Sequence, residues 1–349
     1  MIRHAEAEGN IHRRAHGQYE GQITTNGFVQ IELLKERFKK EKIDAVYSSD
    51  LLRARVTATA LSEPRGLSIN TTKELREVCM GVWEDVAWGD IDYSDPEMSE
   101  HFRSDPARWR IPGGEPYFDL VSRMKGFVKE AALKHDGGTI ALFSHGFAIR
   151  AFFCDLMGYR SDETLKVRHA DNTAVALLFF YKGDLTIEYQ GDASHLSDET
   201  STFARQRWWR AEKQLISENM RFMTLDEERD FELLDSYRQE TWERTKASKE
   251  YTAILSDEPV GFVGLADDAD YENTGRICHI YLKPEYRRQR YGVQLIGLAI
   301  SEFRKKKREF LQIEAPRDNP VVKLCRKQGF EVKSESGELL LLEKYIKNW

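Results

Sequence analysis

Two histidine motifs far apart in the chain constrain its fold more than any other feature. The first is Arg3-His4-Ala5-Glu6, and the second is Phe143-Ser144-His145-Gly146. Each histidine ends an apolar run, as expected at the carboxyl end of a β-strand. In open α/β sheets, ligands bind at the carboxyl ends of the parallel strands. We therefore expect His4 and His145 to lie close together on adjacent strands.

The first half of the chain alternates between helix and strand patterns. Apolar residues recur at helical spacing in 28–42 and 120–131, and residues 147–156 predict a further helix. Short apolar runs at 45–47 and 138–143 are typical of strands, and 174–189 predicts a hairpin. Strands that alternate with helices indicate an α/β fold with a largely parallel sheet.

Composition excludes several classes of function. The net charge is -6, so charge gives no reason to expect a nucleic-acid or membrane partner. The longest apolar run, 174–181, is too short to span a bilayer. The four cysteines have no CxxC spacing and are typical of reduced thiols in a cytoplasmic protein, so we expect no disulfide framework and no metal site.

The residue types near the first histidine favour phosphoryl chemistry. Arg3 and Arg53 are permanent cations whose fork geometry suits a phosphoryl group. A histidine can accept that group covalently, and a protonated carboxylic acid can supply a proton to the leaving oxygen.

A series of motifs in residues 1–198 resembles the histidine phosphatase superfamily, which has the phosphoglycerate-mutase-like fold. The matching residues are Arg3-His4-Ala5-Glu6, Asn10, Ser48-Ser49-Asp50-Leu51, Arg53-Ala54, Thr57-Ala58, Leu75, Glu77, Gly81, Trp83-Glu84, Pro112-Gly113-Gly114-Glu115 and Ser144-His145-Gly146. The resemblance implies a three-layer α/β/α sheet domain. It implies His4 as the phosphate acceptor and Glu77 as the proton donor, and it implies a phosphate pocket of Arg3, Arg53 and His145. It also implies substrate contacts by Asn10, Glu115 and Asn172.

Several points stay open for this first domain. A phosphoglycerate mutase would use the same pocket, although the short domain favours hydrolysis of a small phosphomonoester. Ala5 stands where the family usually has glycine, which is tolerated if its backbone φ is negative. The other histidines are interpreted as structural, with His16 a candidate for the edge of the pocket. Trp83, Trp88 and Trp109 are interpreted as packing residues rather than substrate-stacking residues.

A polar stretch at 191–202 separates the two halves, so we expect a connector at 199–216 and a second domain at 217–349. In the second half, a predicted strand at 277–282 leads into the basic turn Arg287-Arg288-Gln289-Arg290-Tyr291-Gly292. An apolar-faced helix follows from Val293. A basic turn before a helix can bind an anion through backbone N–H groups and the helix dipole.

This second half resembles the GNAT superfamily of acyl-CoA N-acyltransferases, which has a mixed α/β fold. The matching residues are Ile280 to Arg287, the turn to Gly292, and Asp318 to Gly329-Phe330. The resemblance implies that acetyl-CoA and an amine are the substrates. It implies that the coenzyme A pyrophosphate is held by Arg287, Arg288, Gln289, Arg290, Tyr291, Gly292 and Val293. The backbone of Tyr281 and Leu282 would hold the acetyl and pantetheine arm.

The second half departs from its family twice. Arg290 stands where the turn usually has glycine, and Cys325 stands where a tyrosine often protonates the leaving thiolate. A non-catalytic domain that only senses acetyl-CoA is therefore an alternative to an acetyltransferase. The interpretation as a whole is a cytoplasmic enzyme with two activities.

The start of the chain also carries an expectation. A strand buried inside a parallel sheet is usually about 5–6 residues long, and only Met1 and Ile2 precede the first motif. The first strand is thus shortened, and we expect about five or more further apolar residues upstream of Met1 in the native protein. The alternatives are that another segment fills the place of this strand, or that the first domain is unstable.

Overall fold

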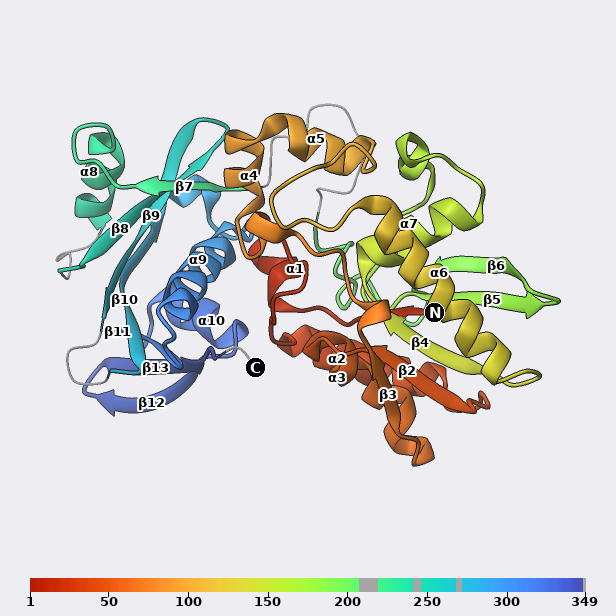
Figure 1. The fold of residues 1–349 in the computed structure, drawn as a ribbon. Coiled ribbons are helices and arrows are strands. Elements are labelled where there is room, and N and C mark those ends of the chain that lie inside the picture. The colour runs from red at the N-terminus through yellow and green to blue at the C-terminus, as the bar shows by residue number, and fades with distance from the viewer. Residues whose placement is uncertain (207–218, 241–245, 268–271, 348–349) are drawn as a thin grey trace. The chain divides into compact units, whose positions relative to one another are not determined.

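The computed structural model describes residues 1–206, 219–240, 246–267 and 272–347 (Figure 1). The chain divides into two compact units. Unit 1 comprises Met1–Glu8, Ala15–Glu84 and Asp95–Ala211, and unit 2 comprises Gly9–Arg14, Asp85–Ser94 and Glu212–Trp349. The domain limits predicted from the sequence remain proposals, and 207–216 of the predicted connector lie outside the described residues.

Over the described residues, unit 1 contains a six-stranded sheet in the order β3-β2-β4-β1-β5-β6. Its strands are β1 (Ile2–Arg3), β2 (Ala45–Ser49), β3 (Ile69–Thr72), β4 (Ile140–Ser144), β5 (Val175–Tyr181) and β6 (Asp184–Asp192). β1, β2, β3 and β4 pair in parallel, whereas β5 and β6 form the predicted antiparallel hairpin. In β1, Ile2 pairs with Phe143 and Arg3 with Ser144, so the two histidine motifs end adjacent parallel strands as predicted.

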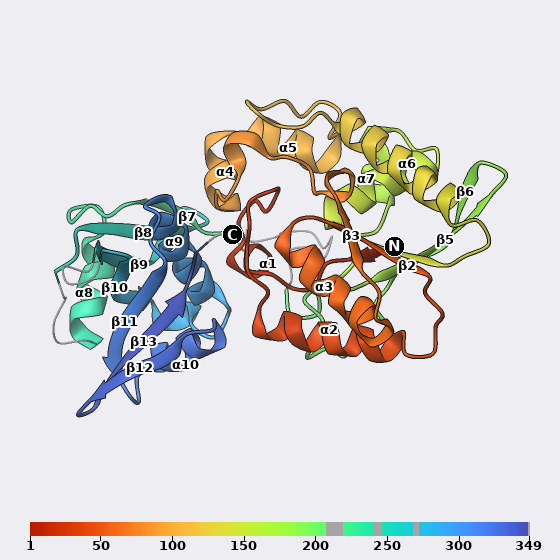
Figure 2. The ribbon, with the colours of Figure 1, turned by 60° about the horizontal axis from the view of Figure 1, so that its bottom comes forward.

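Helices cover both faces of this sheet (Figures 1 and 2). The helices of unit 1 are α2 (Thr25–Arg37), α3 (Leu52–Ser62), α5 (Pro96–Ser104), α6 (Tyr117–Lys134) and α7 (Gly146–Leu156). Val46 and Phe143 share a buried cluster with Leu34 of α2 and Leu61 of α3. The next residue of β2, Tyr47, points to the other face and contacts Phe127 of α6. This alternation confirms the α/β class.

Unit 2 contains a seven-stranded mixed sheet over the described residues, in the order β12-β13-β11-β10-β9-β8-β7. Its strands are β7 (Arg221–Thr224), β8 (Lys249–Leu255), β9 (Glu258–Asp267), β10 (Thr274–Leu282), β11 (Phe310–Pro316), β12 (Glu331–Ser336) and β13 (Leu339–Tyr345). Its helices include α4 (Trp88–Ser94), α8 (Phe231–Glu240), α9 (Tyr291–Lys305) and α10 (Pro320–Lys327). Tyr237 of α8 packs with Phe262 and Tyr281 in one cluster. Leu295 of α9 and Cys325 of α10 belong to a separate, larger core.

Some elements differ from the sequence expectations. The polar stretch after the first motif contains the short helix α1 (Glu8–His12), which was not predicted. The helix predicted to reach residue 42 ends at Arg37, because Phe38 leaves the helical conformation and a lysine-rich turn follows. The helices α4 and α5 were not predicted. No helix among the described residues is long and apolar enough to cross a membrane.

Candidate active sites

His4 follows β1 directly and is anchored through its backbone and its ring. Its N–H donates to the carbonyl of Ser144 (2.9 Å), and its own carbonyl accepts from Asn172 Nδ2 (2.9 Å). The ring atom Nδ1 lies 2.7 Å from the carbonyl oxygen of Ala5. Because a carbonyl can only accept, Nδ1 carries the hydrogen and Nε2 keeps its lone pair. The backbone therefore fixes the tautomer in which Nε2 can act as a nucleophile.

Alanine fits at position 5. Ala5 is fully buried, its N–H donates to Thr57 Oγ1 (2.8 Å), and its φ is not in the left-handed region. Alanine is therefore tolerated at position 5, because the backbone there does not adopt the left-handed conformation that favours glycine.

His145 lies beside His4 at the carboxyl ends of β1 and β4. The ring centroids are 5.1 Å apart, and both residues are buried. Neither ring nitrogen of His145 forms a hydrogen bond with any residue that the structure describes. Buried polar atoms normally have partners, so this ring is suited to contact a polar ligand.

Two arginines complete a positively charged pocket around His4. The Nε atoms of Arg3 and Arg53 are buried, and within the described ranges they form no hydrogen bond. Burial, and then the charges of Arg53 and Arg3, lower the pKa of His4 well below its usual value. The His4 ring is therefore neutral at pH 7, as a nucleophile requires. Two guanidinium forks beside a neutral imidazole suit a transferring phosphoryl group.

Arg53 is oriented by the loop after α1. Its Nη2 donates to the carbonyl of Gly17 (2.6 Å), and its Nη1 lies 3.1 Å from His16 Nε2. The His16 ring centroid is 6.2 Å from that of His4, so His16 does edge the pocket. A Cβ at Gly17 would lie 2.2 Å from Glu84 Oε1, so only glycine fits this close approach.

Glu77 lies at the N-terminus of α7. Its carboxylate accepts from the N–H groups of Phe147 (3.0 Å) and Ala148 (2.8 Å). Burial nevertheless raises the pKa of Glu77 above its ordinary value, against the opposing effect of these N–H groups. A carboxyl group with a raised pKa is suited to donate a proton at neutral pH.

The remaining predicted substrate contacts occupy different places. Asn172 is buried behind His4, where it holds the carbonyl of that residue. Glu115 forms a two-pronged ion pair with Arg123, whose Nη2 also donates to the carbonyl of Glu77 (3.1 Å). Asn10 is half-buried in α1 and belongs to unit 2. Asn172 and Glu115 thus hold neighbouring groups of the site, and their contacts with a substrate stay a prediction.

Packing explains the two tryptophans of unit 1. Trp83 and Trp109 are buried, with ring centroids 5.7 Å apart. Phe102 of α5 contacts both rings and stacks on Phe147, the residue that donates to Glu77. These aromatic residues tie α5 to the start of α7.

In unit 2, the candidate anion site is the turn between β10 and α9. β10 pairs in parallel with β11 only up to Ile277, and its last residues include the buried Tyr281 and half-buried Leu282. The side chains of 287–290 are exposed, whereas Tyr291 and Gly292 are buried and Val293 is half-buried. The first N–H groups of a helix such as α9 have no partner within the helix. The turn therefore offers backbone donors and exposed cations to an anion.

Both residues that depart from the family pattern, Arg290 and Cys325, have unusual surroundings. Arg290 is the residue before α9 and has φ 70°, and Arg288 has φ 61°. A non-glycine residue in this region is strained. Cys325 is fully buried in α10, and burial raises the pKa of its thiol to about 12.

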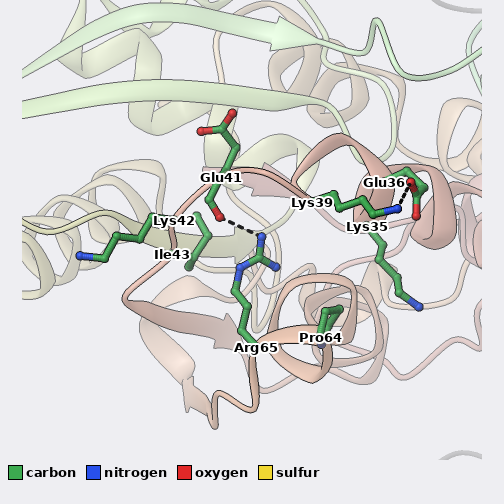
Figure 3. Close-up of a pocket in the computed structure, with 8 residues that line it drawn as sticks. All are labelled: Lys35, Glu36, Lys39, Glu41, Lys42, Ile43, Pro64 and Arg65. Carbon is green, nitrogen blue, oxygen red and sulfur yellow. Dashed lines mark hydrogen bonds and ion pairs between the residues drawn. The ribbon is translucent and has the colours of Figure 1, made fainter.

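A surface hollow of unit 1 lies apart from this chemistry. Figure 3 shows its lining side chains, which are Lys35, Glu36, Lys39, Glu41, Lys42, Ile43, Pro64 and Arg65. Residues 42 and 43 precede β2, so the hollow is at the amino ends of the parallel strands, opposite the edge that carries His4 and His145. Among the described residues, no group of three or more acidic, histidine or cysteine side chains could hold a metal ion.

Two family models match the chain. Residues 1–193 match the histidine phosphatase superfamily (branch 1), and residues 206–330 match the acetyltransferase (GNAT) family.

Similar proteins align with the first of these regions. Phosphoglycerate mutase-like protein 4 of Arabidopsis thaliana is 32% identical over 202 residues, covering 57% of this chain and 86% of that protein. Phosphoserine phosphatase 1 of Hydrogenobacter thermophilus is 29% identical over 158 residues, covering 45% of this chain and 75% of that protein. Among solved structures, YhfR of Bacillus stearothermophilus is 26% identical with a TM-score of 0.54, covering 56% and 96% of the two chains. The mycobacterial glucosyl-3-phosphoglycerate phosphatase Rv2419c complexed with VO3 is 25% identical with a TM-score of 0.51, covering 55% and 98%.

Proposed function

Because the chain belongs to the histidine phosphatase superfamily (branch 1) and carries a GNAT acetyltransferase domain, we propose that it is a bifunctional enzyme. The first domain hydrolyses a small phosphomonoester through a phosphohistidine. The second transfers an acetyl group from acetyl-CoA to an amine. Both reactions are proposed to take place in the cytoplasm.

The phosphatase reaction has two steps. Nε2 of His4 attacks phosphorus, the bond to the leaving oxygen breaks, and Glu77 gives its proton to that oxygen. Glu77 then takes a proton from water as the water oxygen attacks phosphorus. The N–P bond breaks, inorganic phosphate leaves, and His4 is restored. Arg3, Arg53 and His145 stabilise charge on the transferring group.

One observation carries this proposal. Buried side-chain nitrogens of Arg3, Arg53 and His145 gather beside a histidine whose tautomer is fixed with a free lone pair on Nε2. In the part of the chain that the structure describes, these nitrogens have no acceptor. A tetrahedral dianion supplies the acceptors that such a set of donors needs.

The test of the first activity uses full-length protein and p-nitrophenyl phosphate. His4→Ala should abolish turnover, and wild-type protein quenched during turnover should carry an acid-labile phosphate on His4. His135→Asn, at a half-buried histidine after α6, serves as the control and should keep the wild-type rate. Retention of most activity by His4→Ala rejects the proposal.

The same preparations separate hydrolysis from the mutase alternative. With 3-phosphoglycerate, a phosphatase releases inorganic phosphate, whereas a mutase returns the phosphoryl group to a glycerate hydroxyl. We expect inorganic phosphate as the product.

For the second domain, the turn residues 287–293 and the backbone of Tyr281 and Leu282 are proposed to hold acetyl-CoA. The exposed cations of the turn and the N-terminus of the 15-residue helix α9 fit a pyrophosphate. Calorimetry with acetyl-CoA and an acetylation assay over a panel of amines test this proposal. Binding without turnover favours the sensor alternative.

A further inference from the structure

A segment beyond the histidine phosphatase match lies against the phosphate pocket. Residues 197–206, which we call the strap, follow β6, whereas the family match ends at residue 193. The carbonyl of Thr200 accepts from Gln30 Nε2 (2.8 Å) and from Asn26 Nδ2 (3.0 Å). Thr202 is 1% exposed, and its hydroxyl donates to Glu6 Oε2 (2.9 Å). The strap is therefore a packed part of unit 1 rather than a solvated linker.

The strap binds the carboxylate of Asp171. Ser201 Oγ donates to Asp171 Oδ2 (2.5 Å), and the N–H of Phe203 lies 3.3 Å from Oδ1. The N–H of Asn172 adds a further bond to Oδ1 (2.7 Å). Asp171 is 7% exposed, so these donors satisfy a carboxylate that is largely removed from water.

Asp171 is also a negative charge close to Arg3. Its charge acts to raise the pKa of Arg3, against the larger effect of burial. Among the residues that the structure describes, however, Arg3 and Asp171 form no ion pair. Arg3 Nη1 instead donates to the carbonyl of Ala170 (2.6 Å), and its guanidinium carbon lies 5.6 Å from the ring centroid of Phe203.

We propose that Ser201 and Phe203 are positioning residues that keep Arg3 available for the phosphoryl group. This inference rests on the phosphatase function proposed above. An arginine and a carboxylate close together normally form a two-pronged pair that occupies the guanidinium fork. The strap donors hold the carboxylate of Asp171, and the Phe203 ring lies against the guanidinium. Arg3 thus keeps Asp171 nearby as a counter-charge, while its Nε forms no hydrogen bond with the described residues.

The decisive variant is Ser201→Ala in the full-length protein. Without the hydroxyl, Asp171 loses a donor and is free to pair with Arg3. We expect the dissociation constant for inorganic phosphate, measured by calorimetry, to rise about tenfold, as for the loss of one charged hydrogen bond. The KM for p-nitrophenyl phosphate should rise in parallel. Ser197→Ala, an exposed serine-to-alanine change in the same strap, is the matched control and should leave both constants unchanged.

A second change on the Ser201→Ala background distinguishes positioning from a general loss of structure. Asp171→Asn removes the charge that would compete for Arg3. The double variant Ser201→Ala/Asp171→Asn should therefore bind phosphate within about threefold of wild type. If the two substitutions damaged the fold instead, their losses of phosphate affinity would add up in the double variant. Phe203→Leu keeps apolar volume but removes the ring face, and it should weaken phosphate binding about threefold.

Two results would overturn the inference. One is a Ser201→Ala protein that binds phosphate as tightly as Ser197→Ala. The other is a double variant that binds no better than Ser201→Ala alone. If wild-type protein binds phosphate but forms no phosphohistidine, the proposed phosphatase reaction fails, while the phosphate affinities still test the strap.

Discussion

The phosphate pocket of unit 1 and the turn at 287–293 of unit 2 are both candidate anion sites, but they are built in opposite ways. The pocket consists of side chains, and His4, His145 and Arg53 are 3%, 0% and 0% exposed. The turn consists of backbone N–H groups at the start of α9, and its side chains at 287–290 are exposed. A site made of buried side chains depends on each residue type. A site made of backbone tolerates changes of residue type and depends on conformation instead.

This contrast predicts the largest loss of activity for a change at Glu77, the buried carboxyl group that we propose as the proton donor. Glu77→Gln keeps the shape of the side chain but removes the acid. We expect kcat with an alkyl phosphate such as glycerol phosphate to fall about 10³-fold. The loss should be much smaller with p-nitrophenyl phosphate, because nitrophenolate leaves without a proton.

The pH dependence follows from the same group. Burial raises the pKa of Glu77, and only its protonated form donates. The kcat for the alkyl phosphate should therefore fall as the pH rises through that raised pKa. His4 stays neutral across this range, because its pKa lies well below the usual value. The variant Glu77→Gln should lack the alkaline decline, and equal losses on both substrates would contradict the role of Glu77 as the acid.

The same conservative change at the two sites sharpens the comparison. Arg53→Lys removes a fork that donates to Gly17 and lies against His16, so kcat/KM for p-nitrophenyl phosphate should fall about 100-fold. Arg288→Lys keeps a cation on an exposed side chain, so its dissociation constant for acetyl-CoA should change less than about twofold. A large loss of acetyl-CoA affinity in Arg288→Lys would mean that the turn binds through side chains, as the pocket does.

The sequence predicted that His4 and His145 lie close together, because each motif stands at the end of an expected strand. His4 directly follows β1 and His145 directly follows β4, and the parallel pairing of these strands brings the two histidines together. The edge strand β3 was missed, since Ile69 is its sole apolar residue. The helix α5 was missed because Ser99 is its sole buried residue, although Asp95 as N-cap and Pro96 in the first turn are helix-start signals.

The contacts of the strap could not be predicted from the sequence, for a different reason. The hydroxyl of Ser201 and the carboxylate of Asp171 are 30 residues apart, and the β5–β6 hairpin lies between them. Local patterns carry no information on which polar groups pair across such a distance. For the same reason, the pairing of Glu115 with Arg123 emerged only from the structure.

The smallest effect, on stability, is expected at Arg290, where the conformational cost of the backbone site can be measured. Arg290 has φ 70°, a region that costs a non-glycine residue about 1–2 kcal/mol. Glycine removes this strain but loses about 0.5–1 kcal/mol through its greater freedom in the unfolded chain. Arg290→Gly should therefore stabilise the second domain by up to about 1.5 kcal/mol in urea unfolding. The matched control is Arg287→Gly, since Arg287 has φ -72° and glycine there relieves no strain.

Acetyl-CoA affinity should change less than about threefold in Arg290→Gly, because the N–H groups of the turn stay in place. Equal destabilisation by both glycine variants would contradict the strain at Arg290. A tenfold loss of affinity in Arg290→Gly alone would show that this side chain binds the anion, which would make the turn resemble the pocket after all.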